Sequence, residues 1–144
     1  MLEHHLKTKR IKKKNIYKLI YDLFKKKLKK NSTLIDIGCG NGDFLNFVYS
    51  KKKCELHGLE PNKQLFKFAR AQYKDFNFFN IDFAKYKSKI KYDVITAISV
   101  VSHFDNIEFF LDSIKKIAKK DSNIIFSGIF NPNNIDVYVK YKFK

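Results

Sequence analysis

The sequence predicts an α/β fold: a doubly wound, mostly parallel sheet with helices on both faces. Short apolar runs rich in β-branched residues alternate along the chain with segments whose apolar residues repeat at helical spacing. The first such run leads into a glycine-rich turn, Gly38–Gly42, and the second ends in an acidic residue, Glu60. Because this alternation favours right-handed parallel crossovers, we expect strand order 3-2-1-4-5 with a ligand crevice between strands 1 and 4.

The N-terminal segment, residues 10–30, predicts a basic amphipathic helix. Its apolar residues fall on one helical face, and lysines occupy the rest. We expect this helix to pack on the sheet, and a lid over the crevice is the alternative. The members of the predicted inward face are Ile16, Leu19, Ile20, Leu23, Phe24 and Leu28.

The remaining elements follow in the order that a doubly wound sheet requires. Asn31-Ser32 ends the first helix, and Pro61 is expected to fix φ in the first turn of the helix after strand two. The residues expected to face inward from the last helix are Phe109, Phe110, Ile114 and Ile117. The predicted strands are 33–37, 55–59, 76–81, 93–98 and 122–130, and the predicted helices are 43–50, one after Pro61, and 106–119.

The turn Asp36-Ile-Gly38-Cys-Gly40-Asn-Gly42 carries most of the functional information. Glycine has no Cβ, so a ligand can approach the backbone closely. In the dinucleotide fingerprint the third glycine comes one residue later, and the turn holds a pyrophosphate. Here Asp36 and Asp43 flank the turn, and two carboxylates would repel a pyrophosphate. They suit a nucleoside ligand that presents an ammonium group and a sulfonium.

This turn resembles the first motif of the class I S-adenosylmethionine-dependent methyltransferases. Three further segments are similar to the family's later motifs in the same order, from about residue 30 to residue 130: Leu56–Glu60, Phe76–Phe83 and Tyr92–Phe104. The resemblance implies S-adenosylmethionine as cofactor, with Glu60 at the ribose and Asp82 and Phe83 at the adenine. The implied cofactor-binding residues are Asp36, Gly38, Cys39, Gly40, Asn41, Gly42, Glu60, Pro61, Asp82, Phe83 and Ala97.

His103 is the candidate catalytic residue. It lies just past strand four, where the family often has a histidine, and its unperturbed pKa near 6.5 suits proton transfer. A role in supporting the loop or contacting the cofactor is the favoured alternative, because geometry decides whether a histidine acts as a base. Ser99-Val-Val-Ser102 stands where nucleobase amino-methyltransferases carry Asn-Pro-Pro-Tyr. The resemblance therefore implies a methyltransferase acting on a small-molecule or sugar-like acceptor.

The net charge of +16 raises the question of a nucleic-acid partner. The basic residues are 28 lysines with only Arg10 and Arg70, and Lys, Asn, Ile, Phe and Tyr make up 79 of the 144 residues. An AT-rich genome would produce this composition without selection for binding, and phosphate recognition favours arginine. Nucleic acid is thus a less favoured partner, and an RNA-modifying methyltransferase is an alternative function.

The chain is expected to be one cytoplasmic domain that contains no metal. It lacks an apolar stretch of ~20 residues and an apolar N-terminal leader, so we expect neither a membrane span nor a signal peptide. Cys39 and Cys54 should lie at opposite ends of adjacent strands, too far apart for a disulfide. The histidines show no metal-ligand spacing, and His57 is expected to be a packing residue.

The domain is divided into a basic helix (1–30), a cofactor-binding core (31–130) and a tail (131–144). The tail alternates apolar and polar residues over Ile135–Phe143, which could add one edge strand. In the family, the core continues through another helix and an antiparallel hairpin. Because these are missing here, the alternative function is a cofactor-binding module without catalysis, from a truncated or split chain.

Overall fold

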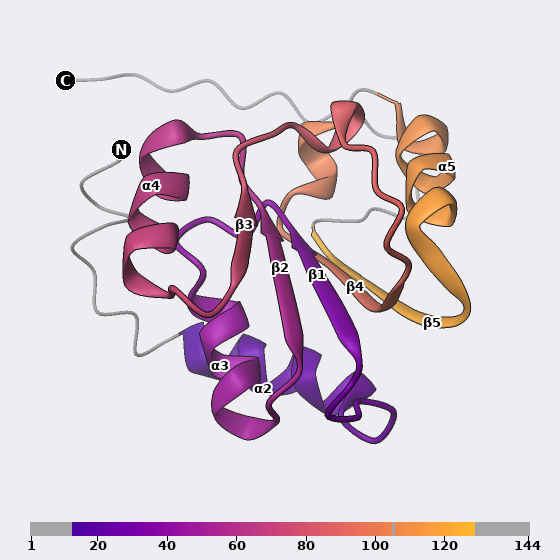
Figure 1. Cartoon of the computed structure of the whole chain (residues 1–144). Helices are drawn as coiled ribbons and strands as arrows, with labels where there is room; N and C mark the ends of the chain where they lie inside the picture. Colours follow the sequence, from indigo (N-terminus) through magenta and orange to yellow (C-terminus); the bar gives the residue numbers. More distant parts are fainter. Residues whose placement is uncertain (1–12, 105, 129–144) are drawn as a thin grey trace, which may run out of the picture.

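The computed structural model of the chain describes residues 13–104 and 106–128. They form a five-stranded parallel sheet of order β3-β2-β1-β4-β5 (Figure 1), which confirms the predicted fold class and strand order. The helices and strands are α2 (Lys13–Phe24), β1 (Thr33–Ile37), α3 (Asp43–Lys51), β2 (Glu55–Leu59), α4 (Lys63–Gln72), β3 (Asn77–Phe79), β4 (Tyr92–Ile98), α5 (Ile107–Ile117) and β5 (Ala118–Ser127), with short 3₁₀ helices η1 (Phe83–Lys85) and η2 (Val101–His103).

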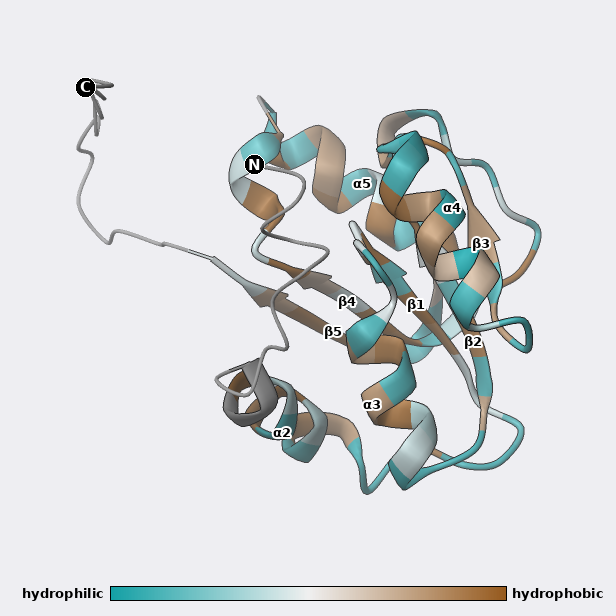
Figure 2. Ribbon diagram, turned by 90° about the vertical axis from the view of Figure 1, so that its left-hand side faces the viewer, coloured by the Kyte–Doolittle hydropathy of each residue, from teal (hydrophilic) through white to brown (hydrophobic). Residues whose placement is uncertain are grey.

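Both faces of the sheet are covered, and the side chains of β1 alternate between two apolar clusters. Leu34 points into a cluster with α2 and α3, and Ile35 and Ile37 point into a second cluster with η1 and α5. Leu34 and Ile35 are fully buried. Strands buried on both faces read as continuous apolar runs, and the mostly brown strands of Figure 2 show this pattern.

Helix α2 packs on the sheet as expected, but it is shorter than predicted. It ends at Phe24, where the amide of Lys27 donates to the Phe24 carbonyl (2.9 Å) in a tighter, three-residue turn. Ile20 and Phe24 are buried, whereas Leu19 and Leu23 are 64% and 63% exposed. The prediction of one inward apolar face was therefore too wide, because only part of that face reaches the sheet.

Strands three and five differ from their predicted bounds. β3 covers only Asn77–Phe79, and β5 begins at Ala118 instead of residue 122. An irregularity explains the early start of β5: Tyr92 pairs with Ala118 and Val94 with Asn123, so the register shifts between them. The Ser122 hydroxyl donates to the Tyr92 carbonyl (2.6 Å) across this bulge.

Two expectations about the helices were wrong. Pro61 does not lie in the first turn of α4, because Asn62 caps this helix by accepting bonds from the amides of Gln64 and Leu65. Phe109 does not face inward: its side chain is 46% exposed, whereas the other three residues expected to face inward from α5 are buried.

His57 is a packing residue, as predicted. It is 2% exposed, and its Nδ1 lies 2.8 Å from the Tyr92 hydroxyl. Both cysteines are free. Among the described helices, none has the length and apolar character needed to cross a bilayer. The cytoplasmic location and the division into helix, core and tail stay predictions, and the predicted edge strand at 135–143 lies outside the described residues.

Candidate functional site

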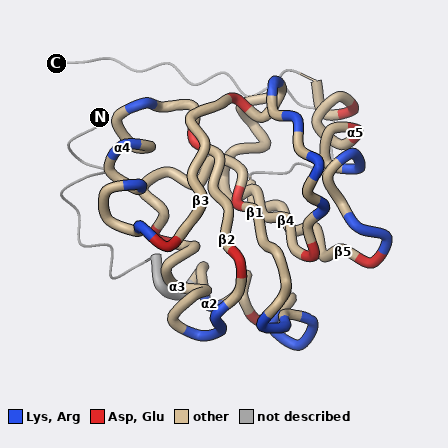
Figure 3. Tube along the Cα trace, in the orientation of Figure 1, with Lys and Arg blue, Asp and Glu red and all other residues tan. Residues whose placement is uncertain are grey.

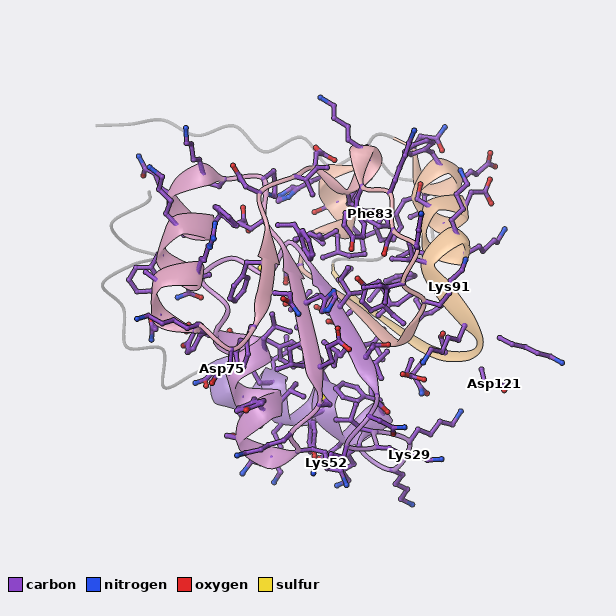
Figure 4. The ribbon with its side chains drawn as sticks, in the orientation of Figure 1. Lys29, Lys52, Asp75, Phe83, Lys91 and Asp121 are labelled. Atoms are coloured by element: carbon purple, nitrogen blue, oxygen red, sulfur yellow. The ribbon has the colours of Figure 1, made fainter. Side chains whose placement is uncertain are left out.

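A cavity of about 710 Å³ lies over the carboxyl ends of the parallel strands. In open α/β sheets this end, at the point where the strand order reverses, is where ligands bind. The residues that follow β1, β2, β3 and β4 all contribute to its wall. Figure 4 shows Phe83, which lines the cavity, at the opposite end of the molecule from Lys29 and Lys52.

The glycine turn forms the floor of the cavity after β1. Gly38, Gly40 and Gly42 all have positive φ (71°, 58° and 82°), a conformation that other residues adopt at a cost. The amides of Gly38 and Cys39 donate to the Leu59 carbonyl (2.8 and 2.9 Å), which joins the turn to the end of β2. The sequence therefore prescribes this turn through its three glycines.

The surroundings of the three glycines differ. A Cβ on Gly38 would lie 2.4 Å from Cγ1 of Val100, and a Cβ on Gly42 would lie 3.0 Å from the rings of Tyr73 and Phe78. A Cβ on Gly40 would meet no atom of the protein within 4 Å. Packing thus requires glycine at positions 38 and 42, whereas Gly40 lines the cavity and a Cβ on it would face open space.

Glu60 connects the end of β2 to the glycine turn. Its Oε2 accepts a hydrogen bond from the Gly40 amide (2.8 Å), and its Oε1 accepts one from the Asn62 amide (2.8 Å). The side chain is only 6% exposed. Each carboxylate oxygen accepts one backbone bond and can accept another, so Glu60 is held in place at the cavity wall and can still accept hydrogen bonds from a ligand.

Asp36 is a buried carboxyl group beneath the turn. It is 3% exposed, and the Thr96 hydroxyl donates to its Oδ1 (2.7 Å). Burial, together with the charge of Glu60, raises the pKa of Asp36 to about 7, although the bond from Thr96 opposes this shift. A carboxyl group with this pKa is poised to lose its proton when a cation binds nearby.

The third acid, Asp82, lies beyond β3 and begins η1. Its Oδ1 accepts a hydrogen bond from the Ala84 amide (2.8 Å), and Phe83 follows as a buried aromatic wall of the cavity. Pro61 also lines the cavity. Among the lining residues that the structure describes, three are acidic and none is lysine or arginine.

The segment after β4 completes the wall. Ser99 has positive φ (58°), and its amide donates to the Ser127 carbonyl (2.7 Å) on β5. This strained residue directs the chain so that Val100 covers Gly38 and the exposed His103 lines the cavity. Cys39 also lines the cavity, and burial raises the pKa of its thiol, which keeps it protonated and unreactive.

The structure brings ten of the twelve predicted site residues to this cavity. Gly42 and Ala97 are not in its wall: Gly42 caps α3, and Ala97 is fully buried in the core beneath the sheet. For Ala97 the reason is strand alternation, because its side chain points into the cluster with α5.

Sequence reasoning missed several lining residues. Ile16 and Tyr17 come from α2, Phe109 comes from α5, and Phe104 and Asn106 lie between η2 and α5. Helical periodicity assigned Ile16 to an inward face and Phe109 to the core, and no local signal distinguishes a cavity wall from a core. The available signal was that Phe104 and Asn106 lie within three residues of His103, which was itself expected at the site.

The chain was compared with known proteins. Residues 4–137 match the family model described as methyltransferase domain. A probable (S)-tetrahydroprotoberberine N-methyltransferase 2 from Papaver bracteatum is 31% identical over 66% of this chain and 28% of its own length. A ubiquinone biosynthesis O-methyltransferase from Pelagibacter ubique (strain HTCC1062) is 32% identical over 71% of this chain and 43% of its own length. The chain thus spans less than half the length of these relatives.

Two solved structures share the fold. Coclaurine N-methyltransferase, bound to N-methylheliamine and SAH, has a TM-score of 0.68 at 19% identity and covers 76% of this chain and 35% of its own. Streptomyces venezuelae DesVI has a TM-score of 0.69 at 18% identity, and the match covers 83% of this chain and 52% of the DesVI chain. The family match extends over most of the sequence and includes the strands and turns that form the cavity. The chain belongs to the methyltransferase domain family.

Proposed function

We propose that the chain binds S-adenosylmethionine in this cavity and transfers its methyl group to a small-molecule acceptor. One observation carries the proposal: three acids from adjacent strands line one cavity, beside a glycine whose missing Cβ faces open space. Asp36 lies near the carboxyl end of β1, and Glu60 and Asp82 lie beyond the ends of β2 and β3. The donor has a net positive charge from its sulfonium and ammonium groups, which matches a wall with three acids and, among described residues, no lysine or arginine.

The described residues fit the donor one group at a time. The buried carboxyl of Asp36 and the turn at Gly38–Asn41 would hold the amino-acid end. Glu60, fixed by two backbone amides, would accept the ribose hydroxyls. Asp82 would meet the adenine amino group, with Phe83 against the ring. The structure of coclaurine N-methyltransferase contains SAH, and the relatives are named N- and O-methyltransferases, which supports S-adenosylmethionine as the ligand.

When bound, S-adenosylmethionine supplies an electrophilic methyl group on sulfur. A lone pair of the acceptor forms the new bond to the methyl carbon while the carbon–sulfur bond breaks, and its electron pair stays on S-adenosylhomocysteine. The contribution of this chain is largely positioning, because an in-line approach supplies much of such catalysis. If the acceptor loses a proton, the imidazole of His103, exposed at the cavity wall, is placed to accept it.

The experiment is a transfer assay with the full chain and tritium-labelled S-adenosylmethionine. The dialysable small-molecule fraction and the RNA fraction of a cell extract are supplied separately as acceptors. We expect label in the small-molecule fraction only. Label in RNA alone would contradict a small-molecule acceptor. No label in either fraction, with S-adenosylhomocysteine still bound, would contradict catalysis by this chain.

A matched pair of glycine variants tests whether the cavity is the donor site. Both Gly38→Ala and Gly40→Ala place a Cβ at positive φ, which costs ~1–2 kcal/mol. Gly38→Ala also meets Val100 and is expected to lower the free energy of unfolding by about 3 kcal/mol in total. Gly40→Ala meets no protein atom, so it should keep most of the stability. Urea unfolding measures both.

Donor binding is the second measurement, and it should be weakened in Gly40→Ala even though this variant keeps most of its stability. The new methyl group of Gly40→Ala extends into the cavity, so S-adenosylhomocysteine affinity should fall about tenfold or more. Unchanged affinity in Gly40→Ala would show that the ligand does not approach this turn, against the proposal.

An RNA-modifying activity has less support than transfer to a small molecule, because the lysines that the structure describes do not surround the cavity. They gather in the turns that precede β1 and β2, at the end of the sheet away from the cavity (Figure 3).

A further inference from the structure

The order of the strands divides the cavity into a donor end and an acceptor end. Asp82, Glu60 and the glycine turn follow β3, β2 and β1 in series, and the donor, if bound as proposed, occupies this row. The wall that remains lies beyond it, toward β4. We name one part of this remainder the acceptor wall, and its residues are Tyr17, Val100, His103, Phe104, Asn106 and Phe109. Ile16, Ile98 and the exposed Ser99 also line the cavity.

The acceptor wall is aromatic and fixed by packing. The ring of Phe104 lies 4.5 Å from the fully buried ring of Phe110 and 6.1 Å, edge to face, from Phe83. On the other side, the Tyr17 ring packs edge-on against Phe44 at 5.4 Å. Rings held in this way form a preformed apolar surface, which favours a flat apolar ligand.

Among the described residues, the acceptor wall contains no lysine or arginine, and its polar side chains are those of Tyr17, His103 and Asn106. The Oδ1 of Asn106 accepts a hydrogen bond from the Phe109 amide (2.8 Å) as the cap of α5. His103 is the group that can accept or donate a proton there. This bond uses one acceptor position of the Asn106 amide, and the amide nitrogen can still donate to an acceptor molecule.

The placement of charge is the second observation, and composition cannot explain it. The full chain has 30 lysine and arginine residues, yet none of those in the described part lines the cavity, whereas three acids do. Genome bias sets how many lysines the chain has but not where the fold places them. An anionic acceptor would enter a cavity without a described counterion and would meet the field of three carboxyl groups.

We propose that the methyl acceptor is a small aromatic or apolar molecule without an anionic group, which presents an amine or hydroxyl lone pair to the donor. This inference rests on the proposed function, since the acceptor wall is defined by where the donor binds. The acids that line the cavity disfavour acceptors that carry a carboxylate or a phosphate.

The test uses two probes of matched shape with the full chain saturated with S-adenosylhomocysteine: uncharged 4-methylphenol and anionic 4-hydroxybenzoate. Saturation-transfer NMR at pH 7 measures the affinity of each. We expect 4-methylphenol to bind at least about tenfold more tightly. Phe109→Lys places an ammonium group on the acceptor wall at an exposed helix position. This variant should bind 4-hydroxybenzoate more tightly, so the ratio of the two probe affinities should decrease.

The control adds the same charge nearby. Leu111→Lys lies on the same helix, is 38% exposed in the parent chain and is not in the cavity wall, so the probe ratio should stay at its original value. Equal or tighter binding of 4-hydroxybenzoate to the original chain, or no binding of either probe, would overturn the inference while leaving the donor site intact. Failure of S-adenosylhomocysteine itself to bind would overturn both the inference and the proposed function.

Discussion

Glu60→Ala is expected to remove S-adenosylhomocysteine binding and to destabilise the fold. The carboxylate accepts hydrogen bonds from two backbone amides, those of Gly40 and Asn62, at a site that is only 6% exposed. Each charge-assisted bond is worth ~1.5–3 kcal/mol, so we expect the loss of both to lower the free energy of unfolding by about 3–6 kcal/mol. Loss of the ribose acceptor and of the ordered turn should lower affinity at least about 100-fold.

The controls separate a local role from a general charge effect. Glu108→Ala removes an exposed carboxylate of α5 outside the cavity wall, and its effect on stability should stay within about 0.5 kcal/mol. Glu60→Asp keeps the charge on a shorter side chain and provides a folded variant if Glu60→Ala does not fold. Near-original binding in both Glu60 variants would contradict the assigned role. Chemical unfolding and calorimetric titration measure the two effects.

Asp36→Asn is expected to stabilise the free protein at neutral and alkaline pH while it weakens donor binding. The folded pKa of Asp36 is raised to about 7, above the unfolded value near 3.9. The stabilising contribution of the protonated group is therefore complete below about pH 4 and is lost as the pH rises to 7. Above pH 7 the buried charge costs on the order of 4 kcal/mol, and an uncharged Asn, which can still accept the Thr96 bond, removes this cost.

The same substitution should change how binding depends on pH. In the original chain, donor cations favour the ionised carboxyl, so affinity should rise by up to about tenfold per pH unit below pH 7, with proton release on binding. In Asp36→Asn this dependence should disappear and the affinity at pH 8 should fall. Unfolding curves and titrations at pH 5, 6, 7 and 8 provide the measurement. A variant that is less stable at pH 8, or that keeps the original pH dependence, would contradict this account.

The parts of the fold that the sequence predicted best were those with local chemical causes. The three glycines prescribed a turn of positive φ, and the strand runs on either side of it set the order of the sheet. Asp36, Glu60 and Asp82 came together because residues at the carboxyl ends of parallel strands share one edge. Such positions follow from topology alone.

Other features depended on tertiary packing that no local pattern encodes. Phe109 has the helical spacing of a core residue but lies at the cavity, and Leu19 has the spacing of an inward face but is exposed. The start of β5 depends on a bond between Ser122 and the distant Tyr92. Pro61 was expected inside α4, but Asn62 caps the helix, which therefore begins two positions later, at Lys63. Each miss reflects a partner distant in sequence or a competing local cap.

The most direct test of the central claim is a calorimetric titration of S-adenosylhomocysteine into the full chain at pH 8 and pH 6. We expect saturable binding that is tighter at pH 8, that Gly40→Ala weakens and that Glu60→Ala removes. Absence of binding at ligand concentrations up to ~1 mM, which corresponds to less than about 4 kcal/mol of affinity, would contradict the assignment of this cavity as a methyl-donor site.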